Sequence, residues 1–380
     1  MILSISSSEI TLKGGNRASF ERILARNVRV ALAPFGTFRV VMGNSRLIAT
    51  SEGDFDAGAV ARAAARTFGV DIVSLCHESP LEIGEIERVA LAHAEVSGRT
   101  FRVEAKRADK RFPLTSQQVN EIVGKALVDK GGKVNLSNPE LTVFIDILSD
   151  RALVSCERLR GPGGLPVGSS GKVLSLLSGG IDSPVASWMM MKRGCSVDFL
   201  HMHTSPDPEA ARDSKIMELA KIVRGYAPTH ATIFMAPYTE FYKASTSVQP
   251  SYELVVFRRF LLRLGAEIAR KHGHKALITG DSVGQVASQT LGNLFATNEA
   301  VQIPVFRPLV AFNKQEIVDL ATKVGTYKLS LEPYKDCCSL VATKHPSTGV
   351  PLEKAKQIEE EINIGKIIEK TLAETKSFEV

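Results

Sequence analysis

The 380-residue sequence lacks the features typical of membrane, secreted and disulfide-rich proteins. No apolar run approaches the ~18 residues of a membrane span, and the first residues show no basic segment followed by an apolar one. The five cysteines form no CxxC pair, so neither a four-thiolate zinc site nor a disulfide framework is predicted. We therefore expect a cytoplasmic protein that does not enter a membrane.

Aromatic residues make up only 6% of the chain, and this scarcity argues against an open platform on which nucleobases stack. Lysine and arginine exceed aspartate and glutamate by 47 to 41, so the composition is compatible with a polyanionic partner. A basic cluster lies between residues 99 and 111, where only Glu104 and Asp109 are acidic. Its basic members are Arg99, Arg102, Lys106, Arg107, Lys110 and Arg111. Such a cluster is typical of a solvated face or of a phosphate-binding surface.

The first 165 residues predict two small α+β units. Over residues 1–77 the order is strand, helix, two strands joined at Gly43–Asn44, helix and strand, which is the ferredoxin-like order. Residues 78–165 predict a second unit, with helices at 82–96 and 116–130 and strands at 100–107, 141–148 and 151–159. The stretch GPGGLPVGSSG then breaks all periodicity, so we predict a linker at 166–171.

From residue 172 onward, apolar strands alternate with helices, which predicts a parallel sheet covered on both faces. The expected strands are 172–177, 196–203, 230–236 and 275–280. The expected helices are 183–193, 208–225, 251–271 and 314–324. The last 30 residues predict charged amphipathic helix, suited to packing or to an oligomer surface.

The segment SLLSGGIDSPVA follows an apolar strand and opens a helix. Gly179 and Gly180 allow the backbone to approach a ligand closely and to point its amide groups at an anion. Ser178 and Ser183 add hydroxyl donors, and the positive end of the helix favours negative charge. Asp182 beside such a site suits a Mg²⁺ ion bound to a polyphosphate. The segment lacks the GxxxxGK[ST] pattern, so it is not a Walker A loop.

Residues 175–186 resemble the SGGxDS loop of the ATP-pyrophosphatase (PP-loop) superfamily, whose members cleave ATP between its α and β phosphates. Other segments resemble one family in particular, the tRNA 4-thiouridine synthetases or tRNA sulfurtransferases. These segments are FRVEAKRADKRFPLTSQQVNEIVG (101–124), YELVVFRRFLLR (252–263), TGDSVGQVASQTLGNL (279–294) and RPLVAFNKQEIVDLATKVGTY (307–327). The resemblance covers nearly the whole chain. It implies a ferredoxin-like domain (1–77), a THUMP RNA-binding domain (78–165) and a doubly wound α/β PP-loop domain (172–380).

The resemblance also implies which residues contact ATP. They are Leu176, Leu177, Ser178, Gly179, Gly180, Asp182, Ser183, His201, Met202, Arg258, Gly280 and Gln289. Without the resemblance, His201 would be taken for a structural residue and Arg258 for a surface charge. The end of one strand beside the loop that ends another is nevertheless where nucleotides bind in such folds.

Lys314 follows Asn313, a predicted N-cap, and so begins a helix. A lysine in the first turn opposes the helix dipole, which favours a functional role for it. The family has an essential lysine at this position. We therefore predict that Lys314 stabilises charge on the phosphates. The predicted catalytic residues are Asp182, Lys314 and Cys337.

The family's reaction defines what the remaining residues must do. Attack of uridine O4 on the α phosphate of ATP gives an adenylated base and pyrophosphate, and sulfur then displaces AMP from C4. ATP and Mg²⁺ are the implied cofactors. Cys337 in PYKDCCSLV aligns with the cysteine that carries the sulfur as a persulfide, and Cys338 is a possible second thiol.

The source of the sulfur is left open by the sequence. Some family members carry a C-terminal rhodanese domain that delivers sulfur and also serves thiamine biosynthesis, whereas here 42 residues follow Cys338. Sulfur could come from a cysteine desulfurase or another persulfide donor, from sulfide, or through an iron–sulfur cluster held by Cys337, Cys338 and a partner's cysteine. An adenylating amidotransferase and a non-enzymatic tRNA-binding protein are the other functions considered.

The family acts on uridine at position 8 of tRNA, which makes tRNA the expected partner. Recognition by RNA shape, through phosphate contacts, fits a chain with few aromatic residues. The predicted phosphate contacts are Arg102, Lys106, Arg107, Lys110 and Arg111. A homodimer is also considered, because one tRNA is large enough to touch two subunits.

Overall fold

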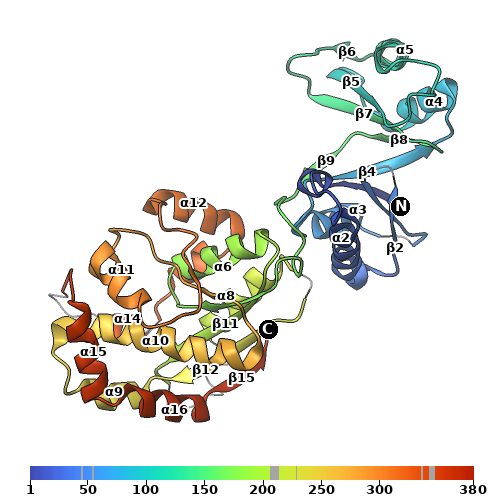
Figure 1. Ribbon diagram of the computed structural model, residues 1–380. Coiled ribbons are helices and arrows are strands. Elements are labelled where there is room, and N and C mark those ends of the chain that lie inside the picture. The colour runs from blue at the N-terminus through green and yellow to red at the C-terminus, as the bar shows by residue number, and fades with distance from the viewer. Residues whose placement is uncertain (44–45, 54, 206–213, 228, 335–336, 342–346) are drawn as a thin grey trace. The chain divides into compact units, whose positions relative to one another are not determined.

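The computed structural model describes residues 1–380 except 44–45, 54, 206–213, 228, 335–336 and 342–346. The chain divides into two units, Met1–Pro166 and Val167–Val380, and each is described by itself (Figure 1). The predicted turn at Gly43–Asn44 lies partly outside the described residues.

The first unit begins with a four-stranded antiparallel sheet in the order β2-β3-β1-β4. Its strands are β1 (Ile2–Ser6), β2 (Arg39–Gly43), β3 (Arg46–Thr50) and β4 (Ile72–Ser79). Its helices are α1 (Ser8–Thr11), α2 (Arg17–Leu32), the 3-10 turn η1 (Ala33–Phe35) and α3 (Ala57–Ala65). Apolar side chains of the strands, α2 and α3 form one core, and this arrangement is the ferredoxin-like fold predicted from the sequence.

The sheet continues through β8, β7, β5 and β6 into the second half of this unit. The strands are β5 (Thr100–Arg107), β6 (Lys133–Val134), β7 (Leu141–Ile147), β8 (Ala152–Ser155) and β9 (Arg158–Arg160), and the helices are α4 (Ile83–His93) and α5 (Ser116–Asp129). The single strand predicted at 151–159 is wrong, because β8 pairs with β7 and the end of β4, whereas β9 pairs with the start of β4. Strand β4 thus belongs to both halves, and the domain boundary predicted at 77/78 falls inside it.

A buried carboxylate ties the two halves together. Asp146 on β7 accepts two hydrogen bonds from Arg46 on β3, at 2.6 and 2.8 Å, and a third from Arg158, at 3.2 Å. The Arg158 guanidinium also lies 3.5 Å from the centre of the Phe144 ring. A charge removed from water is costly unless partners surround it, and the two arginines supply such partners for the Asp146 carboxylate.

The second unit is an α/β domain with a six-stranded sheet in the order β14-β13-β10-β11-β12-β15. The strands are β10 (Lys172–Leu176), β11 (Ser196–His203), β12 (Thr232–Pro237), β13 (Leu277–Ile278), β14 (Val305–Phe306) and β15 (Lys376–Glu379). All are parallel except β15, which pairs with β12 in the antiparallel sense. The predicted parallel strands are confirmed. The prediction that the last 30 residues are entirely helical is wrong, since the strand β15 follows the last helix.

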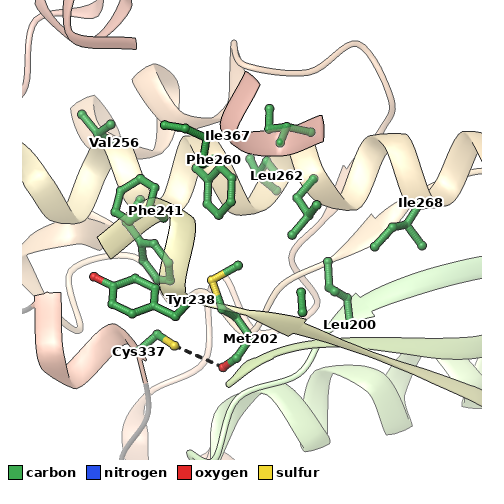
Figure 2. Close-up of a cluster of buried hydrophobic side chains, with 14 of the residues drawn as sticks. Leu200, Met202, Tyr238, Phe241, Val256, Phe260, Leu262, Ile268, Cys337 and Ile367 are labelled. Carbon is green, nitrogen blue, oxygen red and sulfur yellow. Dashed lines mark hydrogen bonds between the residues drawn. The ribbon is translucent and has the colours of Figure 1, made fainter. Parts of the chain in front are cut away.

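Helices cover both faces of this sheet (Figure 1). They are α6 (Asp182–Lys192), α8 (Lys215–Arg224), α9 (Thr239–Ser245), α10 (Pro250–His272), η2 (Ala287–Gln289), α11 (Leu291–Asn298), α12 (Lys314–Val324), α13 (Tyr327–Ser330), α14 (Cys337–Val341), α15 (Leu352–Glu361) and α16 (Ile364–Glu374). The long helix α10 packs Phe257, Phe260 and Ile268 against the sheet, in the cluster shown in Figure 2. Among the described residues, no helix is long and apolar enough to cross a membrane.

A cluster of polar side chains closes the amino-terminal edge of the parallel strands. The Asp198 carboxylate accepts hydrogen bonds from His274 Nε2 and the Thr232 amide, both at 2.9 Å, and pairs with Lys172 Nζ at 2.6 Å. Burial acts to raise the pKa of Asp198, but the hydrogen bonds from His274 and Lys172 outweigh it and the pKa is lowered. The ionised carboxylate therefore stabilises the folded state.

We expect Asp198→Asn to lower the free energy of unfolding by about 2 kcal/mol at pH 7. Because the pKa of Asp198 is lower in the folded chain, its contribution is complete above the unfolded value of about 3.9 and is lost as the pH falls toward the folded value. Urea unfolding from pH 7 to pH 3 measures this, with the exposed Asp319→Asn as a control within about 0.5 kcal/mol of wild type. An equal difference at pH 7 and pH 3 would contradict the assignment.

Candidate active site

A cavity of about 400 Å³ opens at the carboxyl ends of β10, β11 and β13. This edge of a parallel sheet is where ligands bind in doubly wound folds. Every predicted ATP contact except Gly179 and Gly180 lines the cavity: Leu176, Leu177, Ser178, Asp182, Ser183, His201, Met202, Arg258, Gly280 and Gln289. The fold thus brings together residues that lie as much as 113 positions apart in the chain (176 to 289).

The loop between β10 and α6 is organised by its two serine hydroxyls. Ser183 Oγ accepts a hydrogen bond from the Ser178 amide at 2.8 Å, and the two hydroxyls lie 3.1 Å apart. The Gly180 amide donates to Ser178 Oγ at 3.3 Å. These contacts hold the loop at the start of α6, where the helix dipole favours an anion.

Gly280 allows the end of β13 to approach the first turn of α6. A Cβ atom at this position would lie 2.7 Å from the Ser183 amide nitrogen and 2.9 Å from the Asp182 carbonyl carbon. Both neighbours are backbone atoms, which cannot move aside as a flexible side chain could. Residue 280 is therefore restricted to glycine by packing against the loop.

Asp182, which lines the cavity, forms an ion pair with Lys314, which is not among the lining residues. Lys314 Nζ lies 2.8 Å from Asp182 Oδ1, and Gln285 Nε2 donates to Asp182 Oδ2 at 2.8 Å. Lys314 begins α12 behind the predicted N-cap, whose side chain accepts a hydrogen bond from the Glu316 amide. The Lys314 side chain remains 50% exposed, so it can turn from the carboxylate to a bound phosphate.

A buried carboxylate that the sequence analysis missed lies at the base of the cavity. Asp281 accepts hydrogen bonds from Arg258, from Arg307 Nε at 3.1 Å and from Gln289 Nε2 at 3.4 Å. Burial acts to raise the pKa of Asp281, but the charge of Arg258 and its hydrogen bond prevail and the pKa is lowered. Asp281 thus orients two predicted ATP contacts, Arg258 and Gln289. Its position directly after Gly280 was the signal available in the sequence.

Two polar atoms at this base have no hydrogen-bond partner within the described part of the chain. They are Arg307 Nη2 and Gln289 Oε1, and both residues line the cavity although the atoms are inaccessible to solvent. Because an unsatisfied buried polar atom is costly, each of these two atoms calls for a partner that the described side chains do not supply. Arg307 was also missed by the sequence analysis.

His201 lies in the wall of the cavity and is 1% exposed. Its Nδ1 lies 2.9 Å from the Leu177 carbonyl oxygen, and its Nε2 lies 2.8 Å from the Tyr334 hydroxyl. Because the carbonyl only accepts, a neutral ring carries its proton on Nδ1 and accepts from Tyr334 at Nε2. The ring is thus held between the end of β10 and the segment before α14.

Cys337 is the first residue of α14 and lines the same cavity. Figure 2 shows its thiol directed at the carbonyl of Met202, to which it donates a hydrogen bond at 3.2 Å. The side chain of Cys338 lies outside the described residues. In the described ranges, no group of three or more His, Cys, Asp and Glu side chains could hold a metal ion, and the iron–sulfur interpretation stays a prediction.

The residues predicted to contact RNA lie on and after β5. Phe101, Val103 and Ala105 face the core of this half of the unit, so Arg102 and Lys106 lie on the opposite face of the strand, where both pair with Glu104. Arg107 instead donates to the carbonyl oxygens of Phe112 and Leu114, at 3.2 and 2.8 Å.

Lys110 is exposed, and Arg111 pairs with Asp109. Arg107 has a structural role, because it holds the loop that contains Phe112 and Leu114. The phosphate contacts of all five residues predicted to bind RNA stay predictions.

Fold and cavity together define a PP-loop ATP-pyrophosphatase-type domain that follows a ferredoxin-like and a THUMP domain. Family comparison agrees. Residues 168–364 match the thiamine biosynthesis protein (ThiI) family, residues 85–157 the THUMP domain and residues 2–74 the ThiI ferredoxin-like domain.

Full-length relatives give the particular family. Proteins named probable tRNA sulfurtransferase from Caldanaerobacter subterraneus and Moorella thermoacetica are each 38% identical over 374 residues, or 97% of this chain and 97% and 95% of theirs. One from Brevibacillus brevis is 37% identical over 100% of this chain and 96% of its own. The chain belongs to the tRNA sulfurtransferase family, also known as the tRNA 4-thiouridine synthetases, which are enzymes.

Solved structures show the same architecture. A crystal structure of a 4-thiouridine synthetase–RNA complex with bound ATP superposes with a TM-score of 0.88, at 28% identity over 100% of this chain and 99% of that one. A protein from Pyrococcus horikoshii, 23% identical, shares the fold with a TM-score of 0.66 over 85% of this chain and 99% of its own.

We expect Gly280→Ala to weaken ATP binding about tenfold or more, because its methyl group would collide with the backbone of the loop. Titration calorimetry with ATP measures the Kd. Gly292→Ala is the matched control, since the nearest atom to its methyl group would be the Gly349 Cα at 4.0 Å. Unchanged affinity in a folded Gly280→Ala variant would show that the loop tolerates displacement.

We expect reversal of both exposed lysines, Lys106→Glu with Lys110→Glu, to weaken tRNA binding. If each contacts a phosphate, the slope of log Kd against log salt falls by roughly one per lysine. Filter binding at salt concentrations from roughly 50 to 200 mM measures this slope, because affinity that depends on phosphate contacts falls steeply over that range. Lys271→Glu, at an exposed lysine on α10 that the prediction leaves out, is the control. An unaltered slope in the double variant would remove both lysines from the RNA-binding surface.

Proposed function

We propose that this protein is an ATP-dependent tRNA uridine 4-sulfurtransferase that adenylates uridine 8 and replaces its O4 by sulfur from a Cys337 persulfide. The observation that carries the proposal is that Cys337 and all the predicted ATP contacts except Gly179 and Gly180 line one cavity. The loop and the cysteine are more than 150 residues apart in sequence (178 to 337), so only the folded chain brings these residues to one cavity.

Binding of ATP is supported by the residues of the cavity and by the similar 4-thiouridine synthetase that was crystallised with ATP. The loop at the start of α6 suits the phosphates, and Arg258, Arg307 and Gln289 add further polar side chains to the lining of the same cavity. Asp182 offers a carboxylate beside the loop, the ligand type that Mg²⁺ takes in polyphosphate sites. A bound Mg²⁺ would neutralise phosphate charge.

In the first half of the reaction, uridine O4 attacks the α phosphorus and pyrophosphate leaves with the bond electrons. Negative charge grows on the phosphate oxygens during this step. In this proposal Lys314 compensates that charge after it exchanges the Asp182 carboxylate for a phosphate, and Arg258, which pairs with Asp281, contributes a second positive charge. Such preorganised charges lower the barrier because they need no reorientation during the reaction.

In the second half, the terminal sulfur of the Cys337 persulfide attacks C4, and AMP leaves with the former O4. The base is then joined to Cys337 through a disulfide bond. Attack of a second thiol on the Cys337 sulfur, for which Cys338 is the proposed residue, releases 4-thiouridine and leaves a protein disulfide. An external thiol must reduce this disulfide, and a persulfide donor such as a cysteine desulfurase must reload Cys337.

The RNA partner follows from the same family membership. A 4-thiouridine synthetase similar to this chain was crystallised with RNA, and the relatives are named as tRNA sulfurtransferases. The exposed lysines on and after β5 are suited to phosphate contacts that position a tRNA without reading its sequence. We propose tRNA as the substrate on this basis.

Incubation with unmodified tRNA, ATP, Mg²⁺ and a persulfide donor tests the proposal, with nucleoside mass spectrometry for 4-thiouridine and an assay for pyrophosphate. Lys314→Ala should slow pyrophosphate release about 10²–10³-fold. Cys337→Ser should abolish 4-thiouridine while tRNA-dependent pyrophosphate release continues. No 4-thiouridine from the wild type would refute the function, and full activity of Cys337→Ser would refute the persulfide alone.

A further inference from the structure

Tyr334 lies three residues before Cys337 in the sequence. It contacts His201 in the wall of the cavity and Gly179 in the loop between β10 and α6 (177–181), here called the phosphate-binding loop. Its hydroxyl lies 2.8 Å from His201 Nε2, and the two rings lie 5.7 Å apart at an angle of 53°. Its ring also covers Gly179: a Cβ atom on Gly179 would have the Tyr334 Cδ1, Cγ and Cβ atoms as its nearest neighbours, at 2.9, 3.4 and 3.5 Å. One side chain thus joins the loop to the segment of the reactive thiol.

A second connection runs through the end of β11. Cys337 Sγ donates to the carbonyl of Met202, and the adjacent His201 accepts from Tyr334 while its Nδ1 donates to the carbonyl of Leu177, the first residue of the loop. The thiol, the tyrosine and the loop therefore share one connected set of contacts. Displacement of any one of them is opposed by the other two.

Cys337 is only 1% exposed, yet the proposed reaction requires sulfur to reach it from a donor protein. A buried group reacts through local opening, whose free energy is set by the contacts that the opening breaks. We propose that Tyr334 is a positioning residue that couples the phosphate-binding loop to Cys337, so that the placement of Gly179 determines how readily the thiol is exposed. Only the role of Cys337 as sulfur carrier rests on the proposed function.

Alkylation by iodoacetamide tests this coupling without tRNA, ATP or turnover. The full chain is used in a Cys338→Ala background, and the rate is measured by mass spectrometry on the peptide that contains Cys337. Burial raises the pKa of Cys76 to about 12 and that of Cys156 to about 11, so these thiols react slowly. Burial also raises the pKa of Cys195, which lies in the same unit as Cys337 and reports global unfolding.

Two substitutions of Tyr334 separate its hydroxyl from its ring. Tyr334→Phe loses one hydrogen bond, and we expect iodoacetamide to alkylate Cys337 about fivefold faster in this variant than in the parent. Tyr334→Ala loses the ring as well, and the alkylation rate of Cys337 should rise more than about tenfold over the parent. Tyr226→Phe is the matched control, because its hydroxyl bonds the carbonyl oxygens of Lys323 and Val324 elsewhere in the unit, and it should stay within about twofold.

A glycine of the loop tests the coupling itself. Gly179→Ala should displace the Tyr334 ring and accelerate alkylation about fivefold or more. Gly292→Ala, at a position outside the loop, should not, since the nearest atom to its Cβ would be the Gly349 Cα at 4.0 Å. In a Tyr334→Ala background, Gly179→Ala should add no more than about twofold.

Parental rates in Gly179→Ala, or a full additional effect of Gly179→Ala without the tyrosine ring, would overturn the proposal. So would acceleration at Cys195 equal to that at Cys337, because it would indicate unfolding of the whole unit. The proposed function has a separate outcome. If the alkylation pattern is as expected but no 4-thiouridine forms, the coupling stands and the function fails.

Discussion

The close approach of Gly280 to the first turn of α6 is the constraint on which the rest of the site depends. It brings the end of β13 within contact distance of the Ser183 backbone. Asp182 on one side of this contact pairs with Lys314, and Asp281 on the other holds Arg258 and Arg307. A wider separation would place the two carboxylates, and with them the cationic side chains, outside the reach of one ligand.

Buried carboxylates organise both units in a common way. Asp281 in the cavity and Asp146 in the N-terminal sheet each bind two arginines, and Glu359 on α15 binds Arg259 and Arg263 of α10. An ionised carboxylate away from water is costly unless several donors surround it. Each cluster therefore requires elements distant in sequence to arrive together, and each favours one arrangement of them.

Much of the α/β domain could be predicted because its signals are local. Helix 314–324 matches α12 residue for residue, since a capping box begins it and Gly325 in the left-handed region ends it. The prediction that helix extends to the C-terminus was wrong at β15, whose four residues (KSFE) include two charged ones and are largely exposed. They form a strand because β12 offers an unpaired edge, and no property of the segment itself reports that edge.

The sequence by itself determined the loop between β10 and α6, because its glycine and serine residues act there through their own backbone and immediate neighbours. It also determined the family, through motifs spread along the chain. Only the tertiary structure decided that Asp281 and Arg307 complete the cavity, that Arg107 holds a loop, and that Tyr334 lies between Gly179 and the segment of Cys337. These roles depend on contacts between side chains far apart in sequence, and such contacts exist only once the sheet has set which strand ends are neighbours.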